Sequence, residues 1–246
     1  MKKLYEKHEL AFALVWIGLY SVLLSLANFI SGTIGIAFSA HAVVNVALTV
    51  SLFLFLKTNN LMQKYGLCKT SLPAGKFLWY IPLLILASHN LWNGVRMNLP
   101  LAGTACYVMH MLCVGFMEEV IFRGLLFKAI AKSNVREAIV ISSVTFGLGH
   151  VLNLFNGSGM ELVSNLCQIV GAIAIGFLFV TIFYRGGSLI SCIITHSAID
   201  VASAFANEEA MTVEERILFA LTTLAIVVSY TLVLHKTLPH AEAAKQ

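Results

Sequence analysis

The sequence predicts an all-α, polytopic membrane protein with about eight transmembrane helices. Composition is the first observation behind this prediction: 59% of the 246 residues are hydrophobic, only 11% are charged, and the mean hydropathy is +0.85. Soluble proteins carry about 25% charged residues. One core of this size could not hide so much apolar surface from water, so lipid is the expected solvent.

The spacing of apolar segments is the second observation, because about 20 apolar residues span a bilayer as a helix. Turn and charge signals, such as Ser31-Gly32 and Lys132-Ser133-Asn134, separate these segments. The whole chain, residues 1–246, is expected to form a single integral membrane domain. The predicted helices lie at approximately 10–31, 40–56, 77–93, 102–127, 137–155, 162–184, 188–206 and 217–235.

The distribution of positive charge is the third observation, because Lys and Arg are enriched in cytoplasmic loops. With the N-terminus inside, the eight predicted helices leave only Arg96 and Arg216 in outer loops, while Arg123 falls within a helix. Both termini are therefore expected in the cytoplasm. The residues assigned to the inner side are Lys2, Lys3, Lys7, Lys57, Lys64, Lys69, Lys76, Lys128, Lys132, Arg136, Arg185, Lys236 and Lys245.

Three charged residues lie inside the fourth predicted helix, namely Glu118, Glu119 and Arg123 in the string MEEVIFRG. A charged residue at the centre of a membrane helix costs about 2.5–3.5 kcal/mol on insertion scales, whereas each Leu or Ile returns only about 0.3–0.6 kcal/mol. Such a helix is stable only if these groups face other protein groups or water. They therefore indicate a functional site.

Further polar pairs have the i, i+4 spacing that places two side chains on one face of a helix. The string FGLGH ends at His150, and the string HSAID runs from His196 to Asp200. Glu119 and Arg123 share this spacing, with the acid first, which is the better order for an ion pair. Two imidazoles and a carboxylate at similar depth could activate water or hold a metal ion.

Other polar residues in the apolar segments are interpreted as packing groups. His41, His89 and His110 have no partner that is evident in the sequence, and Ser197 points to a different helix face from its neighbour His196. The sequence contains no HExxH zinc motif and no serine in a nucleophile elbow.

The three motifs resemble those of a family of intramembrane endopeptidases that includes the type II CAAX prenyl proteases and bacterial bacteriocin-processing or self-immunity proteins. That family is marked by EExxxR, FxxxH and then HxxxN or HxxxD. Here the strings begin at Glu118, Phe146 and His196 and span about 85 residues, within a motif-bearing core of about 102–206. The resemblance implies about eight helices around an intramembrane catalytic cavity that opens towards the cytosol.

The resemblance also implies roles for the acidic pair and the first histidine. In the glutamate-type mechanism proposed for the family, Glu118 matches the general base and His150 helps it to activate water. Arg123 would be the partner that holds the acidic pair, mainly through Glu119.

His196 and Asp200 match the pair that steadies the oxyanion in such enzymes. The prenyl proteases have Asn where this chain has Asp200. Because a carboxylate cannot donate a hydrogen bond unless it is protonated, Asp200 is expected to orient His196 instead.

Alternative functions remain open. The favoured interpretation needs no cofactor, but His150, His196 and Glu118 could instead bind zinc, since catalytic zinc sites often use two His and one Glu. The chain could also be an inactive bacteriocin-immunity or scaffold protein that binds a peptide in the same cavity. A proton-coupled transporter is least favoured, because the inverted repeats typical of transporters are not evident.

The expected partners are the lipid bilayer and a membrane-associated peptide or protein substrate, with no nucleic acid. The favoured activity is hydrolysis of a peptide bond in that substrate by water that Glu118 and His150 activate. Small size and simple loops favour a multi-pass protein of a prokaryotic cell membrane.

Overall fold

The computed structural model describes residues 1–70, 72–155, 161–207 and 211–239. Helices dominate these ranges, and the only β pairing within them is an isolated bridge between Val95 and Ala206. The predicted class, an all-α polytopic membrane protein, is confirmed.

The helices of the described ranges follow the predicted apolar segments. The chain passes from α5 directly into the π-helical segment Glu119–Leu126 and then into α6, and short 3-10 segments cover Ala74–Tyr80, His89–Leu91 and His150–Leu154. The α-helices are α1 (Lys2–Lys7), α2 (Glu9–Ile34), α3 (Ser39–Thr58), α4 (Ile81–Ser88), α5 (Leu101–Glu118), α6 (Phe127–Ala131), α7 (Val135–Gly149), α8 (Leu162–Gly186), α9 (Ile190–Ser203) and α10 (Val213–Thr237).

Six helical stretches are long and apolar enough to cross a membrane, and each coincides with a predicted span. The other two predicted spans, 77–93 and 188–206, are helical over shorter lengths, as α4 and α9. At about 1.5 Å per residue, a 14-residue helix such as α9 covers about 21 Å of a hydrocarbon core that is about 30 Å thick. The predicted count of eight spans is therefore not confirmed. The six stretches are Glu9–Ile34, Ser39–Thr58, Leu101–Ala131, Val135–Leu154, Leu162–Gly186 and Val213–Thr237.

The predicted helix 77–93 is interrupted by unusual backbone geometry. Leu78, Trp79 and Tyr80 have φ angles of 50°, 53° and 58°, in the left-handed region that residues with side chains seldom adopt. A regular right-handed helix cannot include these residues. It begins only at Ile81, with Pro82 in the first turn, where the missing backbone N–H has no intrahelical partner to lose.

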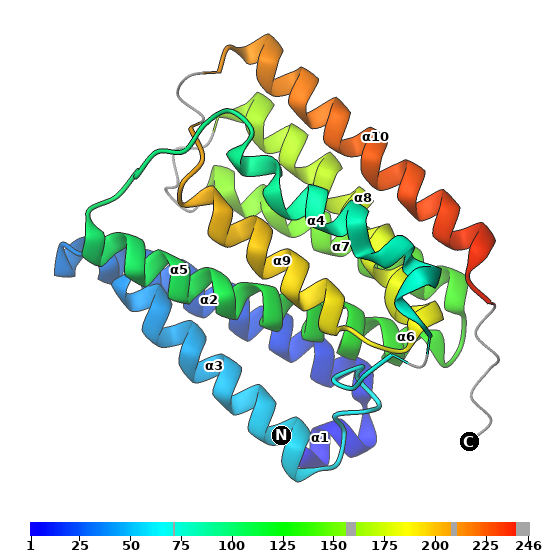
Figure 1. Ribbon diagram of the computed structural model, residues 1–246. Coiled ribbons are helices and arrows are strands. Elements are labelled where there is room, and N and C mark those ends of the chain that lie inside the picture. Colours follow the sequence, from blue (N-terminus) through cyan, green and yellow to red (C-terminus); the bar gives the residue numbers. More distant parts are fainter. Residues whose placement is uncertain (71, 156–160, 208–210, 240–246) are drawn as a thin grey trace.

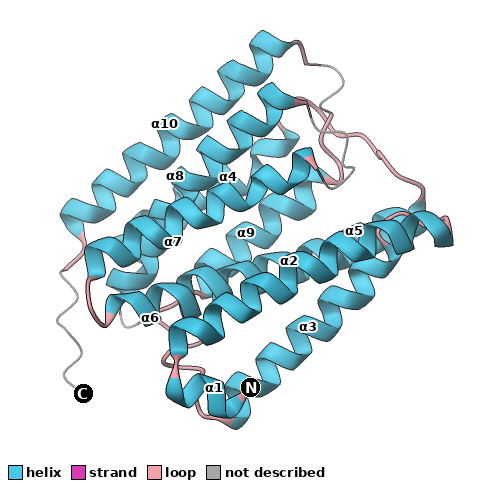
Figure 2. Cartoon of the chain, turned by 180° about the vertical axis from the view of Figure 1, so that it is seen from behind, coloured by secondary structure: helices cyan, strands magenta, loops and turns pink. Residues whose placement is uncertain are grey.

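The arrangement of helices brings the three motifs together. Figure 1 shows α9 between α5 on one side and α4, α7, α8 and α10 on the other, and the reverse view in Figure 2 has the same order. Contacts join α9 to α5 and to α4, while α2 packs against α3 and against the π-helical segment. The helix that carries HSAID therefore lies beside the helix that carries the two glutamates.

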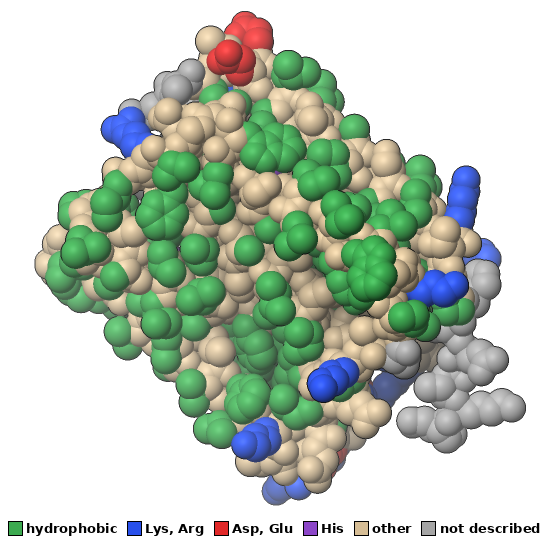
Figure 3. All heavy atoms as spheres, in the orientation of Figure 1, with side chains coloured by type: hydrophobic (Ala, Val, Ile, Leu, Met, Phe, Trp, Pro, Cys, Tyr) green, Lys and Arg blue, Asp and Glu red, His purple; other side chains and the backbone are tan. Residues whose placement is uncertain are grey.

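Charge and hydrophobicity divide the surface as a bilayer would require. The start of the chain and the end of α10 lie at the same edge of the bundle (Figures 1 and 2). Lys and Arg side chains gather along this edge, acidic side chains lie near the start of α10, and the face between is largely hydrophobic (Figure 3). Phe29 and Leu101, for example, are 77% and 76% exposed, as lipid-facing side chains should be.

Small residues allow two close helix crossings, a recurrent feature of membrane proteins. A Cβ added at Gly115 of α5 would collide with the hydroxyl of Ser197 in α9 and would lie 2.6 Å from its backbone nitrogen. A Cβ added at Gly176 of α8 would lie 2.9 Å from the Cα of Ser143 in α7. The first crossing lies one helical turn before the glutamate pair, so it sets how close α9 comes to the site.

Candidate active site

The predicted site residues come from three separate parts of the bundle. Glu118 is the last residue of α5, and Arg123 lies in the π-helical segment that follows. α9 carries His196 and Asp200, and His150 begins the 3-10 segment after α7. Since π-helical turns are rare and are frequently found at functional sites, the backbone also draws attention to this part of the chain.

Glu119 and Arg123 form the fully buried part of the site. Oε1 of Glu119 accepts a hydrogen bond from Nη1 of Arg123 at 3.0 Å, and both side chains are 0% exposed. The guanidinium carbon of Arg123 lies 3.8 Å from the ring centroid of Phe146, within cation–π range. The predicted pairing of Arg123 with Glu119 is thus present in the structure, in a region that solvent does not reach.

His196 connects the two glutamates. Its Nδ1 lies 2.8 Å from Oε1 of Glu119, and its Nε2 lies 3.8 Å from Oε2 of Glu118. The same Nε2 lies 3.4 Å from Oδ2 of Asp200. Both ring nitrogens therefore face carboxylate oxygens, and each can donate when it carries a proton.

Glu118 is the more accessible glutamate of the pair. Its side chain is 18% exposed and that of Asp200 is 22% exposed, against 0% for Glu119. Oε1 of Glu118 accepts a hydrogen bond from the hydroxyl of Tyr20 in α2 at 3.2 Å, while Oε2 faces His196. Two residues that are adjacent in the sequence therefore have different surroundings.

Phe146 packs against both histidines. Its ring centroid lies 5.4 Å from that of His150 and 5.7 Å from that of His196, in edge-to-face geometry. Nδ1 of His150 lies 3.3 Å from the carbonyl oxygen of Phe146. If Nδ1 donates to this oxygen, the neutral ring keeps Nε2 as an acceptor. The side chain of Asn165 in α8 donates to the carbonyl oxygen of His150 at 2.8 Å and helps to hold its backbone.

Residues 100–202 match the sequence model of one protein family, which is described as Type II CAAX prenyl endopeptidase Rce1-like. The matched segment contains every predicted site residue, from Glu118 to Asp200. Residues 100–202 belong to this family. The predicted family is confirmed over this segment, which is named the endopeptidase domain after the family's description. A comparison with curated proteins finds no match.

Three of the four ring nitrogens of His150 and His196 face other polar groups. Both ring nitrogens of His196 face carboxylates, and Nδ1 of His150 faces a carbonyl oxygen. Within the described ranges, no three His, Cys, Asp or Glu side chains are grouped so that they could hold a metal ion.

Two residues that contact the predicted site residues, Phe146 and Tyr20, were assigned no role from the sequence. Phe146 belongs to the FxxxH motif, so its position was visible, but its contact with Arg123 depends on tertiary packing. Tyr20 lies outside the endopeptidase domain, and one tyrosine in an apolar helix gives no signal in the sequence. Ser197 packs as predicted: its hydroxyl donates to the carbonyl oxygen of Leu112 in α5 at 3.2 Å.

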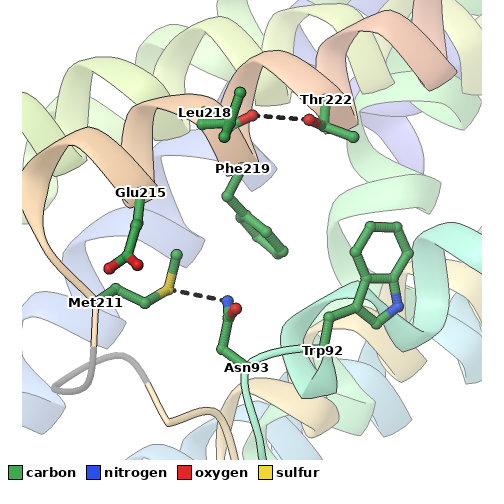
Figure 4. Close-up of a pocket in the computed structure, with 7 residues that line it drawn as sticks. All are labelled: Trp92, Asn93, Met211, Glu215, Leu218, Phe219 and Thr222. Atoms are coloured by element: carbon green, nitrogen blue, oxygen red, sulfur yellow. Dashed lines mark hydrogen bonds between the residues drawn. The ribbon is translucent and has the colours of Figure 1, made fainter.

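A separate cavity of about 350 Å³ lies between the residues that follow α4 and the start of α10 (Figure 4). Figure 4 shows Phe219 of α10 pointing into it and the side-chain amide of Asn93 directed at the sulfur of Met211, at 3.0 Å. None of its lining residues belongs to the three motifs, so it is not part of the endopeptidase site. Those residues are Trp92, Asn93, Met211, Glu215, Leu218, Phe219 and Thr222.

Proposed function

We propose that the protein is an intramembrane endopeptidase that hydrolyses a peptide bond of a membrane-associated peptide or protein, with water activated by Glu118 and His150. The difference between the two glutamates carries this proposal. Glu119 is fully buried and bonded to Arg123, whereas Glu118 is 18% exposed and directs Oε2 towards His196. A general base must reach the proton that it removes, and only Glu118 of this pair is accessible to water.

In the proposed first step, the oxygen of a water molecule attacks the carbonyl carbon of the scissile bond. Glu118 accepts one proton of this water, and Nε2 of His150 accepts a hydrogen bond from the other. A C–O bond forms, and the electron pair of the carbonyl π bond moves to oxygen. Because Glu118 becomes neutral as the oxyanion appears, the net charge of the buried site does not change.

The oxyanion requires a donor in a place from which bulk water is excluded. Nε2 of His196 supplies it in this proposal: its N–H, which faces Asp200 at 3.4 Å, turns to the oxyanion, while Nδ1 stays on Glu119 at 2.8 Å. When the tetrahedral intermediate collapses, the carbonyl re-forms, the C–N bond breaks, and Glu118 returns its proton to the leaving nitrogen. The products are a carboxylic acid and an amine, and Glu118 is ionised again.

The test is cleavage of membrane-associated peptides by the purified protein in lipid vesicles, with products identified by mass spectrometry. Glu118→Gln should give no cleavage while its Tm stays at the wild-type value. Glu214→Gln, the same change at an exposed glutamate of α10, should cleave like the wild type. If the wild type binds peptides and leaves them intact, the protein is an inactive immunity or scaffold member.

Metal content separates this mechanism from the zinc alternative. Active protein should contain far less than one metal ion per chain by elemental analysis, and prolonged chelation should not reduce its activity. Activity that follows zinc content, disappears on stripping and returns on adding zinc would replace the glutamate mechanism with a zinc mechanism.

The same proposal includes an orientation in the membrane. Because cytoplasmic segments are enriched in Lys and Arg, the basic edge seen in Figure 3 should face the cytoplasm, together with both termini. A reporter fused after Gln246 should be active only on the cytoplasmic side. A reporter that is active on the outer side would contradict this orientation.

A further inference from the structure

The contact between Tyr20 and Glu118 reaches beyond the endopeptidase domain. Tyr20 lies in α2, outside residues 100–202, and is 6% exposed. Its hydroxyl donates to Oε1 of Glu118 at 3.2 Å. The hydrogen bond fixes one carboxylate oxygen, so the other oxygen, Oε2, is the one that remains on the side of His196 and Asp200.

A series of buried polar side chains lies next to Tyr20. The side chain of Asn45, in α3 and 0% exposed, lies near the Tyr20 hydroxyl. Asn45 Nδ2 also lies 2.6 Å from Nδ1 of His110 in α5, and the ring of His110 lies 5.1 Å from that of His41. His41 in turn meets the hydroxyl of Ser31 at 3.3 Å.

The donor and acceptor atoms of these side chains set the direction of the hydrogen bond that Tyr20 makes. An amide nitrogen can only donate, so Asn45 Nδ2 donates to an unprotonated Nδ1 of His110. Its second hydrogen is available to the Tyr20 oxygen. A tyrosine oxygen that accepts from Asn45 has its own hydrogen free for Glu118. Successive hydrogen bonds of this kind strengthen one another.

Such a series of polar side chains is costly in a membrane helix bundle, where polar groups need internal partners. A purely structural role would be served equally well by apolar side chains that pack the same space. The series leads to the accessible glutamate, and none of the hydrogen bonds and ion pairs of its members joins them to the buried Glu119–Arg123 pair.

We propose that Tyr20 is a positioning residue for Glu118 and that Asn45 and His110 hold its hydroxyl in place. This proposal rests on the proposed function, because it assigns Tyr20 to the orientation of the general base. α2 and α3 would then complete the reaction centre of a domain whose sequence begins only at residue 100.

The test compares two buried tyrosines in the full-length protein in vesicles. Tyr20→Phe should lower kcat by about 10- to 100-fold, the size expected from a misplaced reacting group, with little change in KM or Tm. Tyr230→Phe is the matched control, because that tyrosine is 3% exposed and donates to the carbonyl oxygen of Phe77 at 2.7 Å, away from the site. It should lower the Tm and leave kcat unchanged.

A second variant tests the series of polar side chains next to Tyr20. Asn45→Leu, which keeps the branched shape and the number of heavy atoms, should lower kcat in the wild-type background and have little further effect when combined with Tyr20→Phe. Residues that act through one network are non-additive in this way. Equal and additive losses would show that Asn45 acts independently of Tyr20.

The outcomes also separate this proposal from the mechanism on which it rests. If Glu118→Gln is inactive while Tyr20→Phe keeps the wild-type kcat, the positioning role is wrong and the proposed base stands. If Glu118→Gln cleaves normally, the proposed function itself is wrong. A loss of kcat in Tyr20→Phe that only follows a loss of folded protein, as the Tm reports it, also overturns the positioning role.

Discussion

The buried and the accessible halves of the site use the same residue type in different ways. In the buried half, Glu119 and Arg123 are 0% exposed and bonded to each other. In the accessible half, Glu118 and Asp200 are 18% and 22% exposed. His196 touches both halves. In the proposed mechanism, this difference in burial assigns charge neutralisation to Glu119 and proton transfer to Glu118.

The largest expected effect comes from breaking the buried half. Arg123→Ala would leave the buried Glu119 with His196 as its remaining partner, and removal of one member of a buried ion pair costs about 3–5 kcal/mol. The free energy of unfolding, measured in detergent, should fall by that amount and activity should be lost with it. Arg136→Ala, at an exposed position near the start of α7, is the control. Equal stability of the two variants would contradict a structural role for Arg123.

A smaller effect is expected from pushing the halves apart. Gly115→Ala would force α5 and α9 to separate at Ser197. Overpacking of this kind lowers the free energy of unfolding by about 1–3 kcal/mol. The resulting shift of His196 should also lower kcat. Gly171→Ala in α8 has no atom within 4 Å of the new Cβ. It should be neutral or slightly stabilising, because alanine is the better helix former. If both variants behave alike, the α5–α9 crossing does not set the site geometry.

The smallest expected effect comes from the ring that packs against both halves. Phe146→Leu removes the cation–π contact to Arg123 and the edge contacts to the two histidines, a loss of about 1–2 kcal/mol in the free energy of unfolding. Phe29→Leu, at a 77% exposed position, should change neither Tm nor kcat. A Phe146→Leu protein with wild-type stability would show that the ring only fills space.

The six long apolar helices and the positions of the motif residues on them could be predicted because local rules determine them. Apolar length marks a membrane helix, and the i, i+4 spacing of Glu119 and Arg123 places them on one face, where the structure pairs them. The cost of charge in lipid predicts that these residues contact other protein groups, as Glu119 and Arg123 do. The packing role of Ser197 followed from its place beside His196 on another face.

Other features depend on contacts between distant parts of the chain. The contact of Tyr20 with Glu118 joins residues 98 positions apart, so no local pattern signals it. His110 likewise gains its partner Asn45 only through the packing of α3 on α5. The break before Ile81 depends on three left-handed residues, Leu78 to Tyr80, which are not residue types that favour this conformation.

The most direct test of the division between the two glutamates is to replace each with glutamine and to measure peptide cleavage and Tm on the same preparations. Glu118→Gln should lose cleavage and keep the wild-type Tm, since its oxygens are partly exposed and its amide can still accept from Tyr20. Glu119→Gln should lower the Tm, because Arg123 is left buried without a counter-charge, and its remaining activity should follow the folded fraction. Cleavage by Glu118→Gln, or a stable but inactive Glu119→Gln, would contradict the assignment of Glu118 as the base.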